Sequence, residues 1–350
     1  RQTLASGGVA PLVKLSDGNA MPQLGLGTWL GKAQDGKRVV PSGVEVENSV
    51  SWAIDAGYRH IDTAHIYNTE EQVGRAVAKK VADGTVTREE LFITTKLWND
   101  KHRREEVVPA LRESLRVLNL TYVDLYLIHW PIAQYYKNIK HKNNYVIFQS
   151  NGTYYECDYT ETWEGMIEAQ KLNLTKSIGV SNFNTKQIDR LIESSKMAPA
   201  VLQVEINLNL QQPALLKYCK EHDIAVTGYT PFGSLFPNKA TEQSPQPRVD
   251  HPTLLAIANK HNKTVPQINL KYLVQLDVTP LPKSLSKSRI EENINIFDFD
   301  LDKDDIIQLN EFNYAYRTLP QLKWIDNIYY PFENNNTTQN NPNQSLLKSH

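Results

Sequence analysis

The chain has few of the residues that define several common classes of protein. Only two cysteines, Cys157 and Cys219, occur among 350 residues, so a framework of several disulfides is excluded. No Cys/His pairs have zinc-finger spacing and H-E-x-x-H is absent, so no metal site is predicted. No apolar run reaches the roughly 18 residues of a transmembrane helix, and none is expected.

The chain also has no excess of charge of one sign, because its formal net charge is only -1. No global field therefore favours nucleic acid or an anionic membrane as partner. A composition of 40% hydrophobic and 22% charged residues is ordinary for a globular protein. No Gly/Ser-rich linker divides the chain, so we predict one folded body over residues 11–332. Residues 1–10 are expected to be flexible, and the Asn-rich residues 333–350 to be a disordered tail.

The folded body is predicted to begin with a β-hairpin and to continue as alternating strands and helices. Asp17-Gly18 is a strong turn signal between residues 13–15 and 22–24. Eight short apolar runs rich in Val, Ile, Leu or Tyr are typical of strands buried on both faces. These strands are predicted at 23–27, 58–62, 91–95, 123–128, 177–180, 201–205, 225–229 and 278–281. Helices are predicted at 45–56, 70–82, 104–118, 162–172, 185–195, 213–222, 252–261, 266–275, 287–296 and 303–312.

Eight strand–helix repeats indicate an α/β protein, a single (β/α)8 TIM barrel with long loops at the C-terminal face. A doubly wound parallel sheet is the alternative. It is disfavoured because the usual dinucleotide fingerprint is missing. In the run GLGTWLG (25–31), Leu30 stands where a third glycine is required, and no helix follows directly.

Four polar side chains fall at or near the carboxyl ends of successive predicted strands, where barrel enzymes place their chemistry. Asp62, Lys96 and His129 follow the second, third and fourth strands, and Tyr67 lies in the loop after Asp62. An ammonium beside a phenol lowers the pKa of the phenol, and a carboxylate holds the ammonium in place. The set suits protonation of a carbonyl oxygen by Tyr67 while hydride reaches the carbon, with His129 orienting the substrate.

Each of these residues also has a structural interpretation. An Asp–Lys pair in a barrel is often only an ion pair, and His129 before Trp130-Pro131 suits an ordinary buried histidine. Tyr67 is one of 17 tyrosines. The functional hypothesis depends on all four lying at neighbouring strand ends.

Several sequence motifs resemble those of the aldo-keto reductase superfamily, in the order in which that family has them. They are GYRHIDTAHIYNTEEQVG (57–74), ITTKLW (93–98), YLIHWP (126–131), IGVSNF (178–183) and LPKSLSKSRIEEN (281–293). The resemblance covers roughly residues 11–332. It implies a monomeric (β/α)8 barrel that reduces carbonyl compounds with NADPH, and it implies Asp62, Tyr67, Lys96 and His129 as the catalytic tetrad.

The resemblance also implies a set of cofactor contacts. Ser181, Asn182 and Gln203 match residues that hold the nicotinamide amide, and Tyr229 matches the ring that stacks on the nicotinamide. The remaining matches are Thr28, Trp29, Ser234, Lys283, Ser284, Arg289, Glu292 and Asn293. Lys283 and Arg289 near a helix N-terminus also form a suitable site for a 2′-phosphate, which favours NADPH over NADH.

Aromatic residues are expected to line the substrate pocket. Trp29, Trp98 and Trp130 lie near His129 in the predicted barrel mouth, with Tyr330 or Phe332 arriving from the C-terminal loop. Such walls with one polar corner suit a small hydrophobic aldehyde or ketone. The Tyr-rich segment 132–160 is expected to be a long specificity loop. The composition resembles insect members of the family, lepidopteran reductases of 3-dehydroecdysteroids included, which suggests a 3-ketosteroid.

The sequence also bears on where the protein is located and on whether it is an enzyme. The chain begins at Arg1 and has seven N-x-S/T sequons, where roughly three or four are expected by chance. They lie at Asn119, Asn151, Asn173, Asn262, Asn335, Asn336 and Asn343. These features favour a secreted glycoprotein, with a cytoplasmic protein as the alternative. An NADPH-binding barrel with a sensing or binding role is the alternative to an enzyme.

Overall fold

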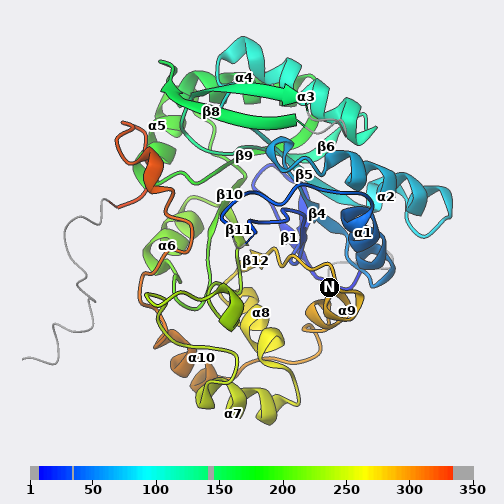
Figure 1. Ribbon diagram of the computed structural model, residues 1–350, viewed down its shortest axis with the longest axis vertical. Coiled ribbons are helices and arrows are strands. Elements are labelled where there is room, and N and C mark those ends of the chain that lie inside the picture. The colour runs from blue at the N-terminus through cyan, green and yellow to red at the C-terminus, as the bar shows by residue number, and fades with distance from the viewer. Residues whose placement is uncertain (1–7, 34, 141–145, 334–350) are drawn as a thin grey trace, which may run out of the picture.

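The computed structural model describes residues 8–33, 35–140 and 146–333. A parallel eight-stranded sheet forms the centre, with helices around it (Figure 1). In sheet order the strands are β12 (Val278–Pro280), β11 (Ala225–Tyr229), β10 (Val201–Glu205), β9 (Thr175–Ser181), β6 (Val123–Ile128), β5 (Phe92–Leu97), β4 (His60–Asp62) and β3 (Leu26–Gly27). The predicted fold class is confirmed.

Two backbone hydrogen bonds close the sheet into a barrel. The amides of Gly25 and Gly27 donate to the carbonyls of Pro280 (3.1 Å) and Pro282 (3.0 Å). Pro280 has no amide hydrogen to donate, but its carbonyl still joins the last strand to the first. The first strand was predicted over 23–27. Only Leu26 and Gly27 pair with β4, while the amide of Gln23 donates to the Pro11 carbonyl and that of Gly25 to Pro280.

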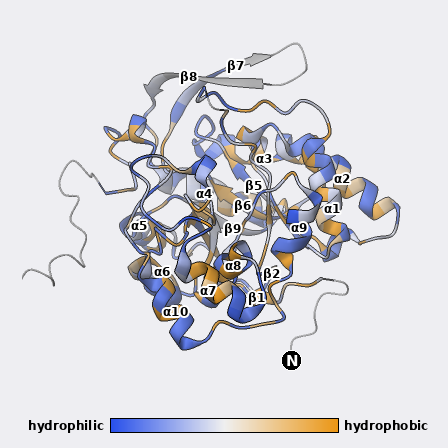
Figure 2. Ribbon diagram, turned by 60° about the horizontal axis from the view of Figure 1, so that its bottom comes forward, coloured by the Kyte–Doolittle hydropathy of each residue, from blue (hydrophilic) through white to orange (hydrophobic). Residues whose placement is uncertain are grey.

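The helices form where the spacing of apolar residues predicts them. They are α1 (Glu45–Asp55), α2 (Glu70–Ala82), α3 (Arg104–Leu118), α4 (Tyr159–Lys171), α5 (Thr185–Ser195), α6 (Pro213–Glu221), α7 (Pro252–His261), α8 (Val265–Gln275), α9 (Lys287–Ile294) and α10 (Lys303–Asn310). Hydrophilic and hydrophobic residues alternate along these outer helices (Figure 2). No helix among the described residues is both long and apolar enough to cross a bilayer.

Local signals explain several of the helix ends. Asn184 and Gln187 form a reciprocal capping box at the start of α5, and Asp302 and Asp305 form one at α10. The helix predicted at 162–172 begins three residues earlier, because the Asp158 side chain accepts from the amide of Thr160 (3.0 Å).

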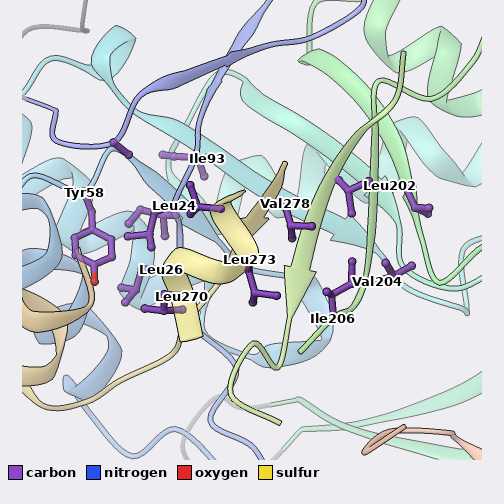
Figure 3. Packing of buried hydrophobic residues seen from close by; sticks show 14 of the residues in the cluster. Leu24, Leu26, Tyr58, Ile93, Leu202, Val204, Ile206, Leu270, Leu273 and Val278 are labelled. Carbon is purple, nitrogen blue, oxygen red and sulfur yellow. The ribbon is translucent and has the colours of Figure 1, made fainter. Parts of the chain in front are cut away.

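Apolar side chains fill the space between the barrel and the helices. Figure 3 shows two residues of α8 in this packing, Leu270 beside Leu26 of β3 and Leu273 toward Val278 of β12. An N-terminal hairpin covers the end of the barrel at which the strands begin. Its strands are β1 (Leu12–Lys14) and β2 (Ala20–Pro22).

The hairpin's register differs slightly from the prediction of 13–15 with 22–24. Leu12 pairs with Pro22, and the amide of Leu15 donates to Asn19 across the turn. Leu15 and Met21 are buried against Phe92 and Val201, which begin β5 and β10. The N-terminal end of the barrel is therefore plugged, and the carboxyl ends of the strands are left for chemistry.

The segment 132–160 is not a simple loop, and that prediction was wrong. It contains the antiparallel strands β7 (Gln134–Lys140) and β8 (Val146–Tyr154). Its content of Tyr, Val and Ile has the composition of strands, but it lies outside the strand–helix repeat that guided the prediction. Residues 1–7 and 334–350, which include most of both predicted tails, lie outside the described residues.

Close packing between strands gives a test of the barrel. Gly179 of β9 lies beside Val201 of β10, and a Cβ there would lie 2.3 Å from the Val201 carbonyl oxygen and 2.9 Å from Leu127 Cδ2. We predict that Gly179→Ala lowers the free energy of unfolding by about 1–3 kcal/mol because the strands must separate.

The measurement is a urea titration of Gly179→Ala beside Gly43→Ala. At Gly43 a Cβ meets only Glu45 Oε2, at 3.9 Å, so this control should unfold like the parent protein. Equal midpoints for the two variants would contradict the packing described.

Candidate active site

The four predicted catalytic side chains meet at the carboxyl ends of the strands. Asp62 is the last residue of β4, Lys96 lies near the end of β5, and His129 follows β6 directly. Tyr67 ends the 3₁₀ helix His65–Tyr67 in the loop between β4 and α2. The rings of Tyr67 and His129 pack edge to face, with centroids 5.7 Å apart.

Lys96 is the centre of the cluster and is fully buried. Its ammonium donates to Asp62 Oδ1 (2.6 Å), to the carbonyl of Thr63 (2.9 Å) and to the phenol oxygen of Tyr67 (3.3 Å). All three donor positions of the ammonium are thus used. Because Lys96 donates to the phenol oxygen, the Tyr67 proton is left to point at a substrate.

A second buried carboxylate supports the charge of Lys96. Burial lowers the pKa of Lys96, while Asp62 and, more weakly, Glu70 raise it. Glu70 begins α2 and accepts hydrogen bonds from Thr95 Oγ1 (2.7 Å) and Ser114 Oγ (3.3 Å). Glu70 was absent from the predicted site, since nothing in the sequence distinguishes it from other acidic residues in a first helical turn.

The expected lowering of the Tyr67 pKa is not found. Burial, followed by the charge of Asp62, raises the pKa of Tyr67 well above its ordinary value, and Arg38 opposes them only in part. A high pKa still suits a proton donor. Hydride addition turns a carbonyl into an alkoxide, which is about as basic as hydroxide and far more basic than a phenolate. A phenol that keeps its proton until then transfers it downhill.

His129 is a neutral imidazole in this setting. Burial and the nearby charges of Lys96 and Arg38 hold its pKa well below the ordinary value. Its buried Nδ1 has no hydrogen-bond partner among the described residues. The neutral ring can therefore hold a carbonyl oxygen through a hydrogen bond without adding a second cation.

The residues predicted to hold the nicotinamide are joined to this centre by hydrogen bonds. Asn182 Nδ2 donates to the carbonyl of His129 (3.1 Å), and the Tyr229 phenol donates to Asn182 Oδ1 (2.7 Å). Gln203 Nε2 donates to Asp62 Oδ2 (2.8 Å), while Ser181 Oγ donates to the Gln203 carbonyl (2.9 Å). Gln203 therefore orients Asp62, a contact that the sequence did not suggest.

Thr28 and Trp29 lie on the other side of the tetrad. Thr28 Oγ1 donates to the carbonyl of Asp62 (2.9 Å) and is buried. The Trp29 ring stacks on the Tyr67 ring with centroids 6.5 Å apart. These contacts fix the loop from which Tyr67 reaches back over Lys96.

A separate basic group lies at the last strand. Lys283 and Ser284 follow β12, and Arg289, Glu292 and Asn293 lie on α9. No acidic side chain of the described residues lies within 4.0 Å of Lys283 or Arg289. Burial and a neighbouring ammonium, Lys239, lower the pKa of Lys283. The sequence analysis missed Lys239, which lies in a loop remote from the recognised motif.

Ser234, predicted to cover the pyrophosphate, is buried in the turn after β11. Thr230 and Gly233 of the same turn both have positive φ, 49° and 50°. A Cβ at Gly233 would clash with the Asn207 side chain at 2.8 Å, so this tight turn needs the glycine.

Aromatic rings from three segments wall the space above the tetrad. The Trp98 ring meets the His129 ring at 5.1 Å and Tyr136 of β7 at 5.5 Å. Trp130 meets Trp324 at 5.0 Å and Phe332 at 5.7 Å. Tyr330 packs on Phe332 at 5.6 Å. Tyr136 and Trp324 were not predicted, because only the fold brings the hairpin and the C-terminal segment to the barrel mouth.

The C-terminal segment that carries Trp324 is fastened by one carboxylate. Glu205 ends β10 and is buried, and its Oε1 accepts from the amide (2.8 Å) and hydroxyl (2.5 Å) of Thr318. Its Oε2 accepts from the amide of Leu319 (3.3 Å). Glu205 thus connects a barrel strand to the wall of the pocket.

Comparisons with known proteins agree with this geometry. The family model described as the aldo/keto reductase family matches residues 23–314. Aldo-keto reductase AKR2E4 of Bombyx mori is 47% identical over 322 residues, which are 92% of this chain and 98% of that protein. Prostaglandin F synthase 1 of Bos taurus is 40% identical over 324 residues, 91% of this chain and 97% of that protein.

Solved structures give the same result. The structure of Bombyx mori AKR2E4 in complex with NADP has a TM-score of 0.83 at 46% identity and covers 92% of this chain and 99% of that one. The structure of AKR2E5 complexed with NADPH has a TM-score of 0.85 at 42% identity and covers 95% and 96%. With the fold, the tetrad and these likenesses together, the chain belongs to the aldo/keto reductase family.

Proposed function

We propose that this protein reduces the carbonyl group of a hydrophobic aldehyde or ketone to an alcohol with NADPH. The observation that carries the proposal is the bond from the buried ammonium of Lys96 to the phenol oxygen of Tyr67, at 3.3 Å. It leaves a phenol proton beside a neutral imidazole, which is the arrangement that protonation of a carbonyl oxygen needs.

Two groups of residues fit an NADPH cofactor, one at its phosphate and one at its nicotinamide. Lys283 and Arg289 have no acidic partner among the described residues, which suits a doubly charged phosphate. Ser181, Asn182, Gln203 and Tyr229 present polar groups and a ring beside the tetrad. When bound, the cofactor supplies the hydride for the carbonyl carbon.

The chain's own residues then manage the substrate oxygen. Neutral His129 donates a hydrogen bond to the carbonyl oxygen and sets its position. Tyr67 gives its proton to the same oxygen as negative charge develops there. Lys96 stabilises the phenolate that remains, and Asp62 keeps Lys96 charged and aligned.

For the substrate we propose a 3-ketosteroid such as 3-dehydroecdysone. Trp98, Trp130 and Trp324 gather apolar ring surface near the tetrad, which suits a hydrophobic fused-ring substrate. A panel of 3-ketosteroids, ecdysteroids, long-chain aldehydes and sugars, followed by NADPH absorbance, tests the choice. We expect the highest kcat/KM with a 3-ketosteroid, and a preference for sugars would refute it.

A Tyr67→Phe variant tests the chemistry. The ring keeps its packing on Trp29 and His129 while the acidic proton is lost, so we expect kcat to fall by about 10²–10⁴. The Kd for NADPH, measured by fluorescence titration, should stay within about threefold because cofactor contacts are untouched. Turnover close to that of the parent protein would show that another group donates the proton.

The alternative function is an NADPH-binding barrel with a sensing or binding role. The complete tetrad favours an enzyme. A purified protein that binds NADPH but oxidises none of it with the whole panel would favour the alternative.

We also propose that the chain acts as a monomer, because all the candidate site residues come from one chain. Light scattering should then give a mass near 39.9 kDa for the unmodified chain. A stable dimer at assay concentrations would oppose this.

Secretion stays a proposal, with a cytoplasmic location as the alternative. Asn119, Asn173 and Asn262 are exposed, which glycosylation requires. All three have positive φ at helix ends, a conformation that asparagine tolerates better than most residues, so their presence also has a structural reason. Asn119 is the C-cap of α3, which ends at Leu118.

Mass spectrometry of the protein expressed in insect cells with a secretion signal decides whether these sequons are used. A glycan on Asn119 or Asn262 of the native protein supports the secretory route. Native protein without glycans at any sequon favours the cytoplasmic alternative.

A further inference from the structure

Three basic side chains lie at the rim of the aromatic pocket and are not used by the proposed chemistry. Lys32 and Arg38 belong to the segment between β3 and α1, and Lys323 belongs to the C-terminal segment. We call Lys32, Arg38 and Lys323 the basic rim. All three are exposed, so a ligand in the pocket can reach them.

Arg38 is directed toward the tetrad by its own segment. Lys32 and Arg38 form an antiparallel bridge, which the Ala33 amide extends by donating to the Lys37 carbonyl (2.8 Å). The guanidinium of Arg38 then donates to the carbonyl of Ile66. Ile66 directly precedes Tyr67, so one edge of the guanidinium is fixed beside the proton donor and its other nitrogens remain for a ligand.

Lys323 approaches the same pocket from the C-terminal segment, drawn in orange-red in Figure 1. The Tyr154 phenol donates to the Lys323 carbonyl (3.5 Å), and the Lys323 ammonium lies 4.7 Å from the Trp324 ring centroid. Trp324 in turn lies 6.4 Å from Trp98, which packs on His129. Two segments far apart in the sequence thus place cations around one set of rings.

The basic rim has no acidic partner within the part of the chain that the structure describes. No acidic side chain of the described residues lies within 4.0 Å of any of its members. Two acidic residues lie on the same segments. Asp35 pairs with Lys37 (3.6 Å), and Asp326 forms no ion pair within 4.0 Å among the described residues. Residues 1–7, 34, 141–145 and 334–350 contain neither Asp nor Glu.

Electrostatics shows that the three charges act on one another and on the site. Although the Lys323 side chain is exposed, partial desolvation of its ammonium, followed by the charges of Lys32 and Arg38, lowers its pKa. Arg38 also helps to lower the pKa of His129. Like charges held together in this way repel each other, and an anion placed among them relieves that repulsion.

We propose that the basic rim binds an anionic group (carboxylate, sulfate or phosphate ester) of a substrate whose carbonyl lies at Tyr67 and His129. The inference rests on the proposed carbonyl reduction and deepens it, because it assigns a charge to the far part of the substrate. The basic group at Lys283 and Arg289 follows a different strand, β12, and is kept for the cofactor. Among 3-ketosteroids, an acidic conjugate such as a sulfate or phosphate ester would then be favoured over the free steroid.

The test compares acids with their methyl esters, which have the same ring and aldehyde but no charge. The probes are 3- and 4-formylbenzoate and the two methyl formylbenzoates, and the readout is the acid-to-ester ratio of kcat/KM. We expect that the ratio falls about tenfold in Arg38→Gln and in Lys323→Gln for at least one of the acids. In the parent protein it should also fall as salt is raised, since exposed charges are screened.

Lys37→Gln is the matched control, because Lys37 lies beside Arg38 on the same segment with its side chain 85% exposed and paired with Asp35. Its ratio should equal that of the parent protein. Ratios that are unchanged in both rim variants, or that fall equally in Lys37→Gln, would overturn the proposal.

A binding measurement separates this inference from the proposed function. Quenching of tryptophan fluorescence gives the Kd of 3- and 4-(hydroxymethyl)benzoate and of their methyl esters without any turnover. One outcome is that the esters are not reduced, but an acid binds at least about tenfold more tightly than its ester and this difference in Kd disappears in Arg38→Gln. The anion site is then supported and the reductase proposal fails. If the esters are reduced but neither acid is favoured in rate or affinity, the site fails and the reductase stands.

Discussion

The ion pair between Lys96 and Asp62 is the interaction on which the rest of the site depends. Two opposite charges are buried at the mouth of the barrel, where each costs several kcal/mol to remove from water. The cost is offset because the ammonium uses all three of its donor positions and both oxygens of the carboxylate accept a hydrogen bond. Lys96 also donates to Thr63 and Tyr67, and Gln203 donates to the second oxygen of Asp62. Loss of any of these partners would leave a buried charge unsatisfied.

The barrel makes this pair possible by fixing its members on adjacent strands. Asp62 and Lys96 belong to β4 and β5, which are neighbours in the sheet, and Gln203 belongs to β10 across the barrel. The strands are joined by backbone hydrogen bonds around the whole circle, so the charged groups cannot drift apart. The segments outside the barrel have a different role. They carry the aromatic rings and the basic rim that surround the tetrad.

Much of the architecture could be predicted from the sequence because its causes are local. Short apolar runs give the strands, and the helices at 70–82, 104–118, 185–195 and 252–261 have the predicted bounds. The tetrad followed from the positions of strand ends. Other features depend on contacts between distant segments and were therefore missed. Trp324 reaches Trp130, and Arg38 reaches Ile66, only after folding. The pKa of Tyr67 was predicted in the wrong direction, because burial and the charge of Asp62 outweigh the nearby Arg38 guanidinium.

The charge states of the site make its function depend on pH in a defined way. Reduction needs a protonated Lys96, a protonated Tyr67 and a neutral His129. Burial lowers the pKa of Lys96 below the 10.5 of a free lysine, while the pKa of Tyr67 is raised, so Lys96 is the first of the two to lose its proton as the pH rises. The pKa of His129 lies well below 6.5, so no change in its charge is expected near neutrality.

The most direct measurement is the pH dependence of kcat/KM for carbonyl reduction, which reports on the free enzyme. The site described here predicts a flat profile through pH 6.5 and a single loss of activity at alkaline pH, with a midpoint below 10.5. A loss of activity centred near pH 6.5, or an alkaline midpoint at or above 10.5, would contradict the role assigned to the buried Lys96 ammonium.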